Sequence, residues 1–138
     1  MVIGARHALI SRLDHLVLTV RDLDVTCDFY RRVLGMQEIT FGGGRRALAF
    51  GNQKINLHLA GHEFEPKAER ATAGSADLCF VLEGSLDDAV TRLGVEKVPV
   101  LLGPADRIGA LGKMRSVYLR DPDGNLLELS SYDIESFS

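Results

Sequence analysis

The strongest constraint on the fold is an order of predicted elements that the chain uses twice. From residue 12 to about 60, hydrophobic periodicity predicts a strand, a helix and three further strands. A polar connector follows at 61–75, and the same order begins again at 76 and continues to about 133. We therefore expect a single domain spanning 1–138, of the α+β class, made of two βαβββ modules joined by this connector.

The first module carries clear boundary signals. Residues 13–20 alternate and are rich in Val, Leu and Thr, which predicts a strand. In DLDVTCDFYRRVLG the apolar residues fall at helical spacing, and the helix can begin at Asp22 or Asp24 and end at Gly35. Three short strands complete the module, at 36–41, 46–50 and 54–59.

The second module repeats these signals. Residues 76–82 predict a strand, and Ser85 is placed as the N-cap of a short helix that ends at Leu93-Gly94. The repeated Leu-Gly helix end supports the duplication. Three strands follow at 98–102, 115–120 and 126–131, and DPDGN at 121–125 is a strong turn signal between the last two.

Composition narrows the class of partner. Hydrophobic residues make up 46% and charged residues 25%, with a net charge of -3, so neither nucleic acid nor an anionic membrane is expected as a partner. No apolar run approaches the ~20 residues of a membrane span. The first residues do not resemble a secretory signal, and Cys27 and Cys79 suit buried reduced thiols. We expect a cytoplasmic protein that acts on a small molecule.

Aligning the modules strand by strand pairs four residues of metal-ligand type. His15 in the first strand of module one matches Asp77 in module two, and His58 in the last strand matches Glu128. Side-chain alternation places each of them opposite the more apolar face of its strand. The apolar faces can pack on the helices, and the other faces can line a shared cleft. Two carboxylates that converge in a cleft favour a divalent cation, with two neutral imidazoles completing the ligands.

Each of these residues also has a structural alternative. His15 taken alone is more often a hydrogen-bonded structural histidine than a ligand. His58 taken alone could be exposed on an edge strand, and Asp77 and Glu128 could face solvent or pair with arginine. Only their equivalent positions in the two modules favour the metal site.

The motifs LDHLVLTVRDL, FYRRVLGM and RDPDGNLLELS carry a resemblance over 12–133. Through them the chain resembles the vicinal oxygen chelate superfamily, also called the glyoxalase/bleomycin resistance/dioxygenase superfamily. GNQKINLHLAGHEFEPKA and the stretch 103–110 are similar to the branch of glyoxalase domain-containing protein 5 and to small bacterial virulence-type proteins. The resemblance implies two modules that form a U-shaped mixed β-sheet cleft flanked by helices, in a homodimer.

The resemblance also implies a metal site at His15, His58, Asp77 and Glu128, holding Ni, Co, Zn, Mn or Fe. Glyoxalase I typically has an acid where this chain has His58 and a histidine where it has Asp77. The inventory of two imidazoles and two carboxylates is nevertheless preserved. A ring-cleaving dioxygenase needs a histidine at the position of Asp77, which argues against that chemistry.

The function that the resemblance implies is a metal-dependent glyoxalase-type lyase or isomerase that acts through an enediolate. Glu128 is the candidate base, and Asp77 could share that role. The alternatives are a ring-cleaving dioxygenase, a non-enzymatic drug-binding resistance protein, or transfer of a thiol to an epoxide. Three cations are candidates for binding an anionic part of the substrate, although solvated surface charge explains them equally well: Arg107, Lys113 and Arg115.

Overall fold

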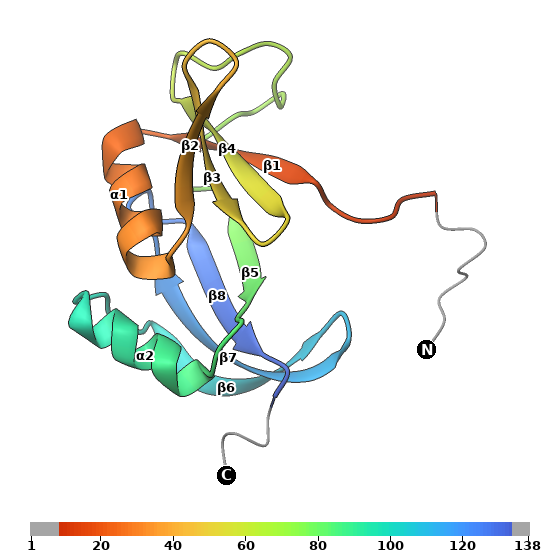
Figure 1. Ribbon diagram of the computed structural model, residues 1–138, viewed down its shortest axis with the longest axis vertical. Coiled ribbons are helices and arrows are strands. Elements are labelled where there is room, and N and C mark those ends of the chain that lie inside the picture. The colour runs from red at the N-terminus through yellow and green to blue at the C-terminus, as the bar shows by residue number, and fades with distance from the viewer. Residues whose placement is uncertain (1–8, 134–138) are drawn as a thin grey trace.

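The computed structural model describes residues 9–133, which form two four-stranded mixed sheets and two helices (Figure 1). Figure 1 shows the two modules stacked along the long axis of the molecule, with both helices on the same side. Module one consists of β1 (His15–Val20), α1 (Leu23–Leu34), β2 (Gln37–Phe41), β3 (Arg45–Phe50) and β4 (Gln53–Leu59). Module two consists of β5 (Asp77–Val81), α2 (Leu86–Val95), β6 (Leu102–Gly109), β7 (Gly112–Arg120) and β8 (Leu126–Ser131).

The two sheets have the same topology, which confirms the predicted repeat. Their strand orders are β1-β4-β3-β2 and β5-β8-β7-β6. In each sheet the first strand pairs in parallel with the last strand of its module, and the remaining pairs are antiparallel. The helix supplies the crossover that a parallel pair requires. Within the described range, no helix is both long and apolar enough to cross a membrane.

Helix α1 begins and ends at residues that the sequence indicates, whereas α2 begins after the predicted cap Ser85 but continues past the predicted end at Leu93-Gly94 to Val95. The Asp22 carboxylate accepts a hydrogen bond from the Val25 N–H at 3.0 Å and caps α1. Gly35 ends α1 with a φ of 72°, a left-handed conformation that glycine adopts without steric cost. Ser85 caps α2 through the Asp88 N–H at 3.0 Å.

The predicted strand at 98–102 is wrong, because the edge strand β6 begins at Leu102 and extends to Gly109. Gly103 and Pro104 interrupt the hydrophobic pattern of residues 102–109, so the sequence did not indicate a strand there. An edge strand tolerates proline because the missing N–H can face solvent. The register shift between Leu102 and Ala105 accommodates this interruption.

One apolar core joins both modules. The faces that alternation predicts to be apolar, such as those of Leu18, Ile55 and Leu127, are buried against the helices. Residues of both modules belong to the same cluster, including Tyr30 of α1 and Leu86 of α2. The opposite sheet faces are therefore left to carry polar side chains.

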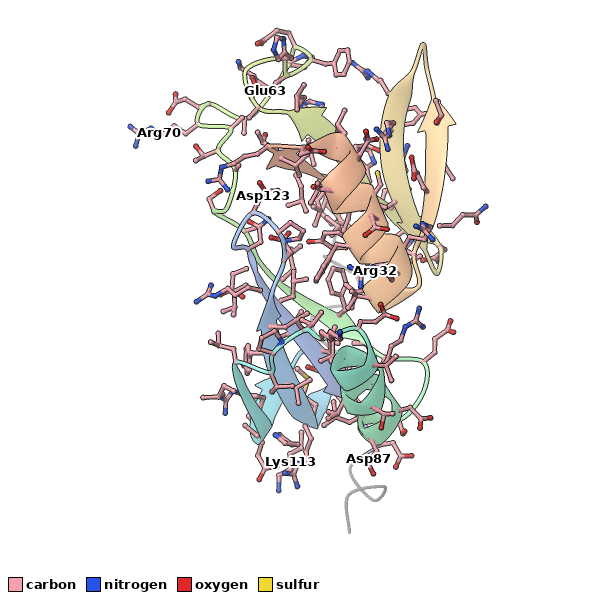
Figure 2. The ribbon with its side chains drawn as sticks, turned by 90° about the vertical axis from the view of Figure 1, so that its left-hand side faces the viewer. Arg32, Glu63, Arg70, Asp87, Lys113 and Asp123 are labelled. Atoms are coloured by element: carbon pink, nitrogen blue, oxygen red, sulfur yellow. The ribbon has the colours of Figure 1, made fainter. Side chains whose placement is uncertain are left out.

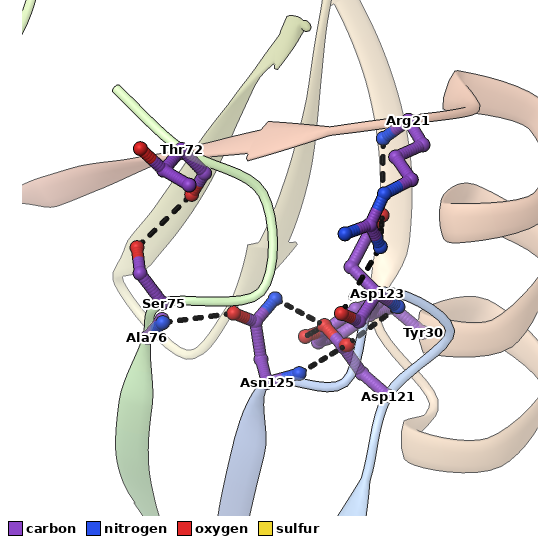
Figure 3. A network of polar contacts seen from close by, with 8 residues as sticks. All are labelled: Arg21, Tyr30, Thr72, Ser75, Ala76, Asp121, Asp123 and Asn125. Atoms are coloured by element: carbon purple, nitrogen blue, oxygen red, sulfur yellow. Dashed lines mark hydrogen bonds and ion pairs between the residues drawn. The ribbon is translucent and has the colours of Figure 1, made fainter. Parts of the chain in front are cut away.

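A buried polar network also fastens the modules together (Figure 3). It is centred on Asp121 in the DPDGN turn, whose carboxylate accepts hydrogen bonds from the Tyr30 hydroxyl at 2.6 Å and the Asn125 amide at 2.8 Å. The backbone N–H groups of Asp123 and Asn125 donate to the same carboxylate, each at 2.9 Å. Burial, followed by the charge of Asp121, raises the pKa of Tyr30. The turn therefore acts as an anchor between module two and helix α1.

Candidate functional site

On module one, His15 is the first residue of β1 and its ring is partly exposed. Its Nδ1 lies 2.9 Å from a carboxylate oxygen of Asp14, and this hydrogen bond lowers the pKa of Asp14. A carboxylate that accepts the Nδ1 proton fixes the imidazole tautomer and leaves Nε2 as the electron-pair donor. His15 is thus prepared to act as a ligand through Nε2.

The predicted equivalence of His58 with Glu128 is wrong, because the two strand pairs have different partners at these positions. Glu128 pairs with Cys79, the third residue of β5, whereas His58 pairs with Thr19, the fifth residue of β1. The third residue of β1 is Val17, and its partner is Asn56. Asn56 therefore holds the position equivalent to Glu128, and His58 lies two residues further along β4.

Asn56 is the residue that sequence reasoning missed. Its side-chain oxygen is buried and has no hydrogen-bond partner among the described residues. In the sequence, Glu128 lies between two leucines and can be aligned with either of two polar residues of the first module. Asn56 lies between Ile55 and Leu57, and His58 lies between Leu57 and Leu59, so the apolar pattern fits both alignments equally well. A shift of two residues preserves the face of every side chain, and alternation alone cannot detect it.

His58 is buried, with 9% of its surface exposed, because the connector folds over its end of the sheet. The ring centroids of His58 and Phe64 are 5.4 Å apart in an edge-to-face arrangement. The Nδ1 atom of His58 is fully buried and has no hydrogen-bond partner within residues 9–133. Burial lowers the pKa of His58, and the charges of Arg45 and Lys67 act in the same direction.

His58 also lines a pocket of about 460 Å³ between the connector and β1. Its walls include Thr19 from β1, Asn125 from the anchoring turn and Lys67 from the connector. Figure 2 shows the connector side chains Glu63 and Arg70 above module two. This pocket is of the size that small-molecule sites occupy.

On module two, Asp77 is exposed at the start of β5 and Glu128 is half-buried on β8. The Ser130 hydroxyl donates to a Glu128 carboxylate oxygen at 3.3 Å and lies 2.6 Å from the Ser116 hydroxyl. Cys79 is exposed, contrary to the predicted burial, because its strand face is open. Partial burial raises the pKa of the Cys79 thiol, and the Glu128 carboxylate adds to this. The face therefore presents a carboxylate and a protonated thiol, and the hydroxyls of Ser116 and Ser130 lie buried beside them.

Of the three predicted cations, only Arg107 shares this face. It donates from Nε to the Tyr118 hydroxyl at 2.8 Å, and Tyr118 pairs directly with Glu128. Alternation along β7 turns Lys113 and Arg115 to the opposite face. Arg115 forms an ion pair with Asp106 at 3.6 Å.

The predicted ligands do not meet within one chain. No three side chains of His, Cys, Asp or Glu within residues 9–133 lie close enough together to hold a metal ion. His15 belongs to the first sheet, whereas Asp77 and Glu128 belong to the second. A single chain therefore carries its potential metal ligands in two separate groups, one on each sheet, and does not by itself fit a metal ion.

The chain belongs to the Glyoxalase/Bleomycin resistance protein/Dioxygenase superfamily, which it matches over residues 12–129. It is 52% identical over 124 residues to "Virulence protein STM3117" of Salmonella typhimurium, covering 90% of this chain and 86% of that protein. It is 54% identical over 127 residues to "Glyoxalase domain-containing protein RDO1" of Mycosarcoma maydis, covering 92% and 72%. The integron cassette protein VCH_CASS1 from V. cholerae superposes with a TM-score of 0.89 at 54% identity, covering 91% and 98%.

More distant relatives include proteins that are named for an activity. "Metallothiol transferase FosB" of Shouchella clausii is 27% identical over 124 residues, covering 88% of this chain and 80% of that protein. Lactoylglutathione lyase from Agrobacterium tumefaciens superposes with a TM-score of 0.69 at 25% identity, covering 91% and 96%.

Proposed function

We propose that the chain is a divalent-metal-dependent lyase or isomerase of the glyoxalase type, acting on a small oxygenated substrate. The observation that carries the proposal is the pairing of His15 with Asp14 on the open face of β1, at 2.9 Å. Metal-ligating histidines characteristically donate their second ring nitrogen to a carboxylate in this way. Superfamily membership and the similarity to a lactoylglutathione lyase support the same chemistry.

The ligands that we propose are His15, Asp77 and Glu128. His58 is left out, because it is buried beneath the connector and out of register with Glu128. A nitrogen and two carboxylates suit Ni, Co, Zn, Mn or Fe. The bound ion would supply Lewis-acid polarisation of neighbouring substrate oxygens.

Glu128 is the proposed general base. Its carboxylate can accept a proton from a substrate carbon, and the Ser130 hydroxyl bonded to it at 3.3 Å orients it. Asp77 is exposed at the start of β5 and can share this role. Arg107, held against Tyr118 on the same face, is placed to bind an anionic substituent of the substrate.

We further propose that a second copy of the chain completes the site in a homodimer. Module one of one copy would face module two of the other, which brings His15 opposite Asp77 and Glu128. Apolar residues on the open faces support this arrangement, because Val17 is 45% exposed and Val81 is 60% exposed beside the proposed ligands. Pairing would remove both from water.

Metal analysis of protein purified without chelator tests the ligand set. We expect His15→Gln and Glu128→Gln to lose most of the bound metal, because each removes one of three donors. The matched control is His62→Gln, which alters an exposed histidine of the connector and should retain the metal content of the wild type. Equal metal in His15→Gln, Glu128→Gln and wild type would contradict the proposal.

Mixing two inactive variants tests the shared site. Dimers that combine a His15→Gln copy with a Glu128→Gln copy have one intact site if the modules of different copies meet. Random exchange of symmetric dimers then restores about a quarter of the wild-type metal content. A site formed within one chain restores none.

Activity separates the candidate reactions. Turnover of the methylglyoxal–glutathione hemithioacetal by the metal-loaded protein would establish glyoxalase I activity. Its absence with every first-row metal would leave other reactions of the class, including the thiol transfer named for the relative FosB. The pocket beside His58 favours one further candidate function, a protein that binds a small molecule without changing it. Full occupancy of the pocket by an unchanged ligand in metal-free protein would establish that function.

A further inference from the structure

The pocket beneath the connector contains a polar side chain that nothing in the chain satisfies. His58 is only 9% exposed, lines the pocket, and its Nδ1 has no hydrogen-bond partner within the described residues. A buried polar group without a partner costs free energy, and native structures usually supply one. A bound ligand is the partner that the open pocket can admit.

The charge around the pocket selects the sign of that ligand. Lys67 and Arg70 line it, and the Lys67 ammonium lies 3.5 Å from a carboxylate oxygen of Glu63 and 3.5 Å from one of Glu65, which offset its charge. Arg45 lies over the Phe64 ring at 4.1 Å and, after burial, contributes to the lowered pKa of His58. Arg70, whose guanidinium has no such carboxylate partner within residues 9–133, therefore supplies the uncompensated charge, and Figure 2 shows its side chain at the edge of the connector. Cations at the mouth of a low-dielectric pocket attract an anion.

The remaining walls select a ligand with an apolar body. Pro66, Ala68 and Ala71 line the connector side, and Val17 lines the β1 side. The hydroxyls of Thr19 and Thr72 provide the other polar contacts. A volume of about 460 Å³ accommodates a small organic acid.

We propose that this pocket binds a small organic carboxylate, with a ring N–H of His58 donating to the carboxylate and with Arg70 supplying the positive charge. Guanidinium and carboxylate groups form the strong charge-assisted pairs that such recognition uses. The pocket needs neither a metal ion nor the residues His15, Asp77 and Glu128. The proposal therefore stands apart from the proposed metal-dependent function.

A matched pair of ligands tests it on the full chain after treatment with chelator. Butyrate and butyramide have nearly the same shape and differ in charge, and inorganic phosphate tests an anion without an apolar body. Amide chemical shifts are followed by nuclear magnetic resonance during titration. We expect saturable shifts centred on His58, Ala68, Ala71 and Thr72, with butyrate binding at least about tenfold more tightly than butyramide.

Variants place the binding in this pocket. Arg70→Gln and His58→Gln should each weaken butyrate binding by about three- to tenfold. Arg31→Gln removes a comparable exposed charge from α1 and should bind as the wild type does, and so should His15→Gln. Because Arg70 is a surface residue, its variant tests the proposal even where the change at His58 disturbs folding.

Equal affinity for butyrate and butyramide would overturn the proposal, as would phosphate binding without butyrate binding. Unchanged butyrate affinity in both Arg70→Gln and His58→Gln would overturn it as well. Loss of metal binding in His15→Gln with retained butyrate binding separates this site from the proposed metal centre.

Discussion

The two modules share their strand order but use their open faces differently. In module one the connector covers one end of the face and buries His58, and the position equivalent to Glu128 holds the amide of Asn56. In module two the face stays open and surrounds Glu128 with serine hydroxyls. Because the opposite faces supply the core, these faces could diverge without loss of the fold.

The final hairpins of the modules differ in the same way. The turn between β7 and β8 is buried against module one, and Asp121 in it accepts four hydrogen bonds. The corresponding turn between β3 and β4, at Gly51-Asn52, is exposed. Equivalent turns thus carry very different shares of the stability.

The largest expected effect breaks this anchor. Asp121→Ala leaves the buried Tyr30 hydroxyl and three N–H donors without their acceptor, so we expect a loss of about 3–5 kcal/mol in the free energy of unfolding. Urea denaturation measures it. The control is Asn52→Ala in the exposed turn, which should change stability by less than about 0.5 kcal/mol. Equal effects would refute the difference between the turns.

Tyr30→Phe removes one hydrogen bond from the same network and should cost about 1–2 kcal/mol near pH 7. The pKa of Tyr30 is raised in the folded state, so its stabilising contribution is complete below the unfolded pKa of about 10 and is lost as pH rises above it. The difference between wild type and Tyr30→Phe should shrink above about pH 10, at up to ~1.4 kcal/mol per pH unit. Denaturation at pH 7, 9 and about 10.5 tests this sign.

The variant Asn56→Glu places a carboxylate on β4 of module one, at the position equivalent to Glu128 on β8 of module two. Because the Asn56 side-chain oxygen is buried, the new charge should lower stability by about 1–2 kcal/mol in chelator. Added divalent metal should restore much of that loss, since the variant supplies another anionic donor. Thermal denaturation with and without metal measures both effects. No response to metal would argue against a metal centre beside β4.

The smallest expected effect concerns His58. His58→Gln should leave the metal content unchanged, because the strand register places His58 away from the position of Glu128. Elemental analysis beside Glu128→Gln provides the contrast. A parallel loss of metal in both variants would return His58 to the ligand set.

The sequence by itself determined the duplicated βαβββ order, the α+β class, the family and the helix caps at Gly35 and Ser85, and it left the N-cap of α1 between Asp22 and Asp24. It also predicted which strand faces are apolar, since alternation is a local property. It placed β6 wrongly, because Gly103 and Pro104 conceal an edge strand whose pairing with β7 defines it.

Only the tertiary structure decided how β4 aligns with β1. The two strands are parallel and far apart in the sequence, so hydrogen bonds across the sheet fix their register. A two-residue shift keeps every side chain on its face, which is why Asn56 and His58 were indistinguishable beforehand. The burial of His58 likewise depends on the connector folding back over the sheet, a contact that no periodicity in the chain encodes.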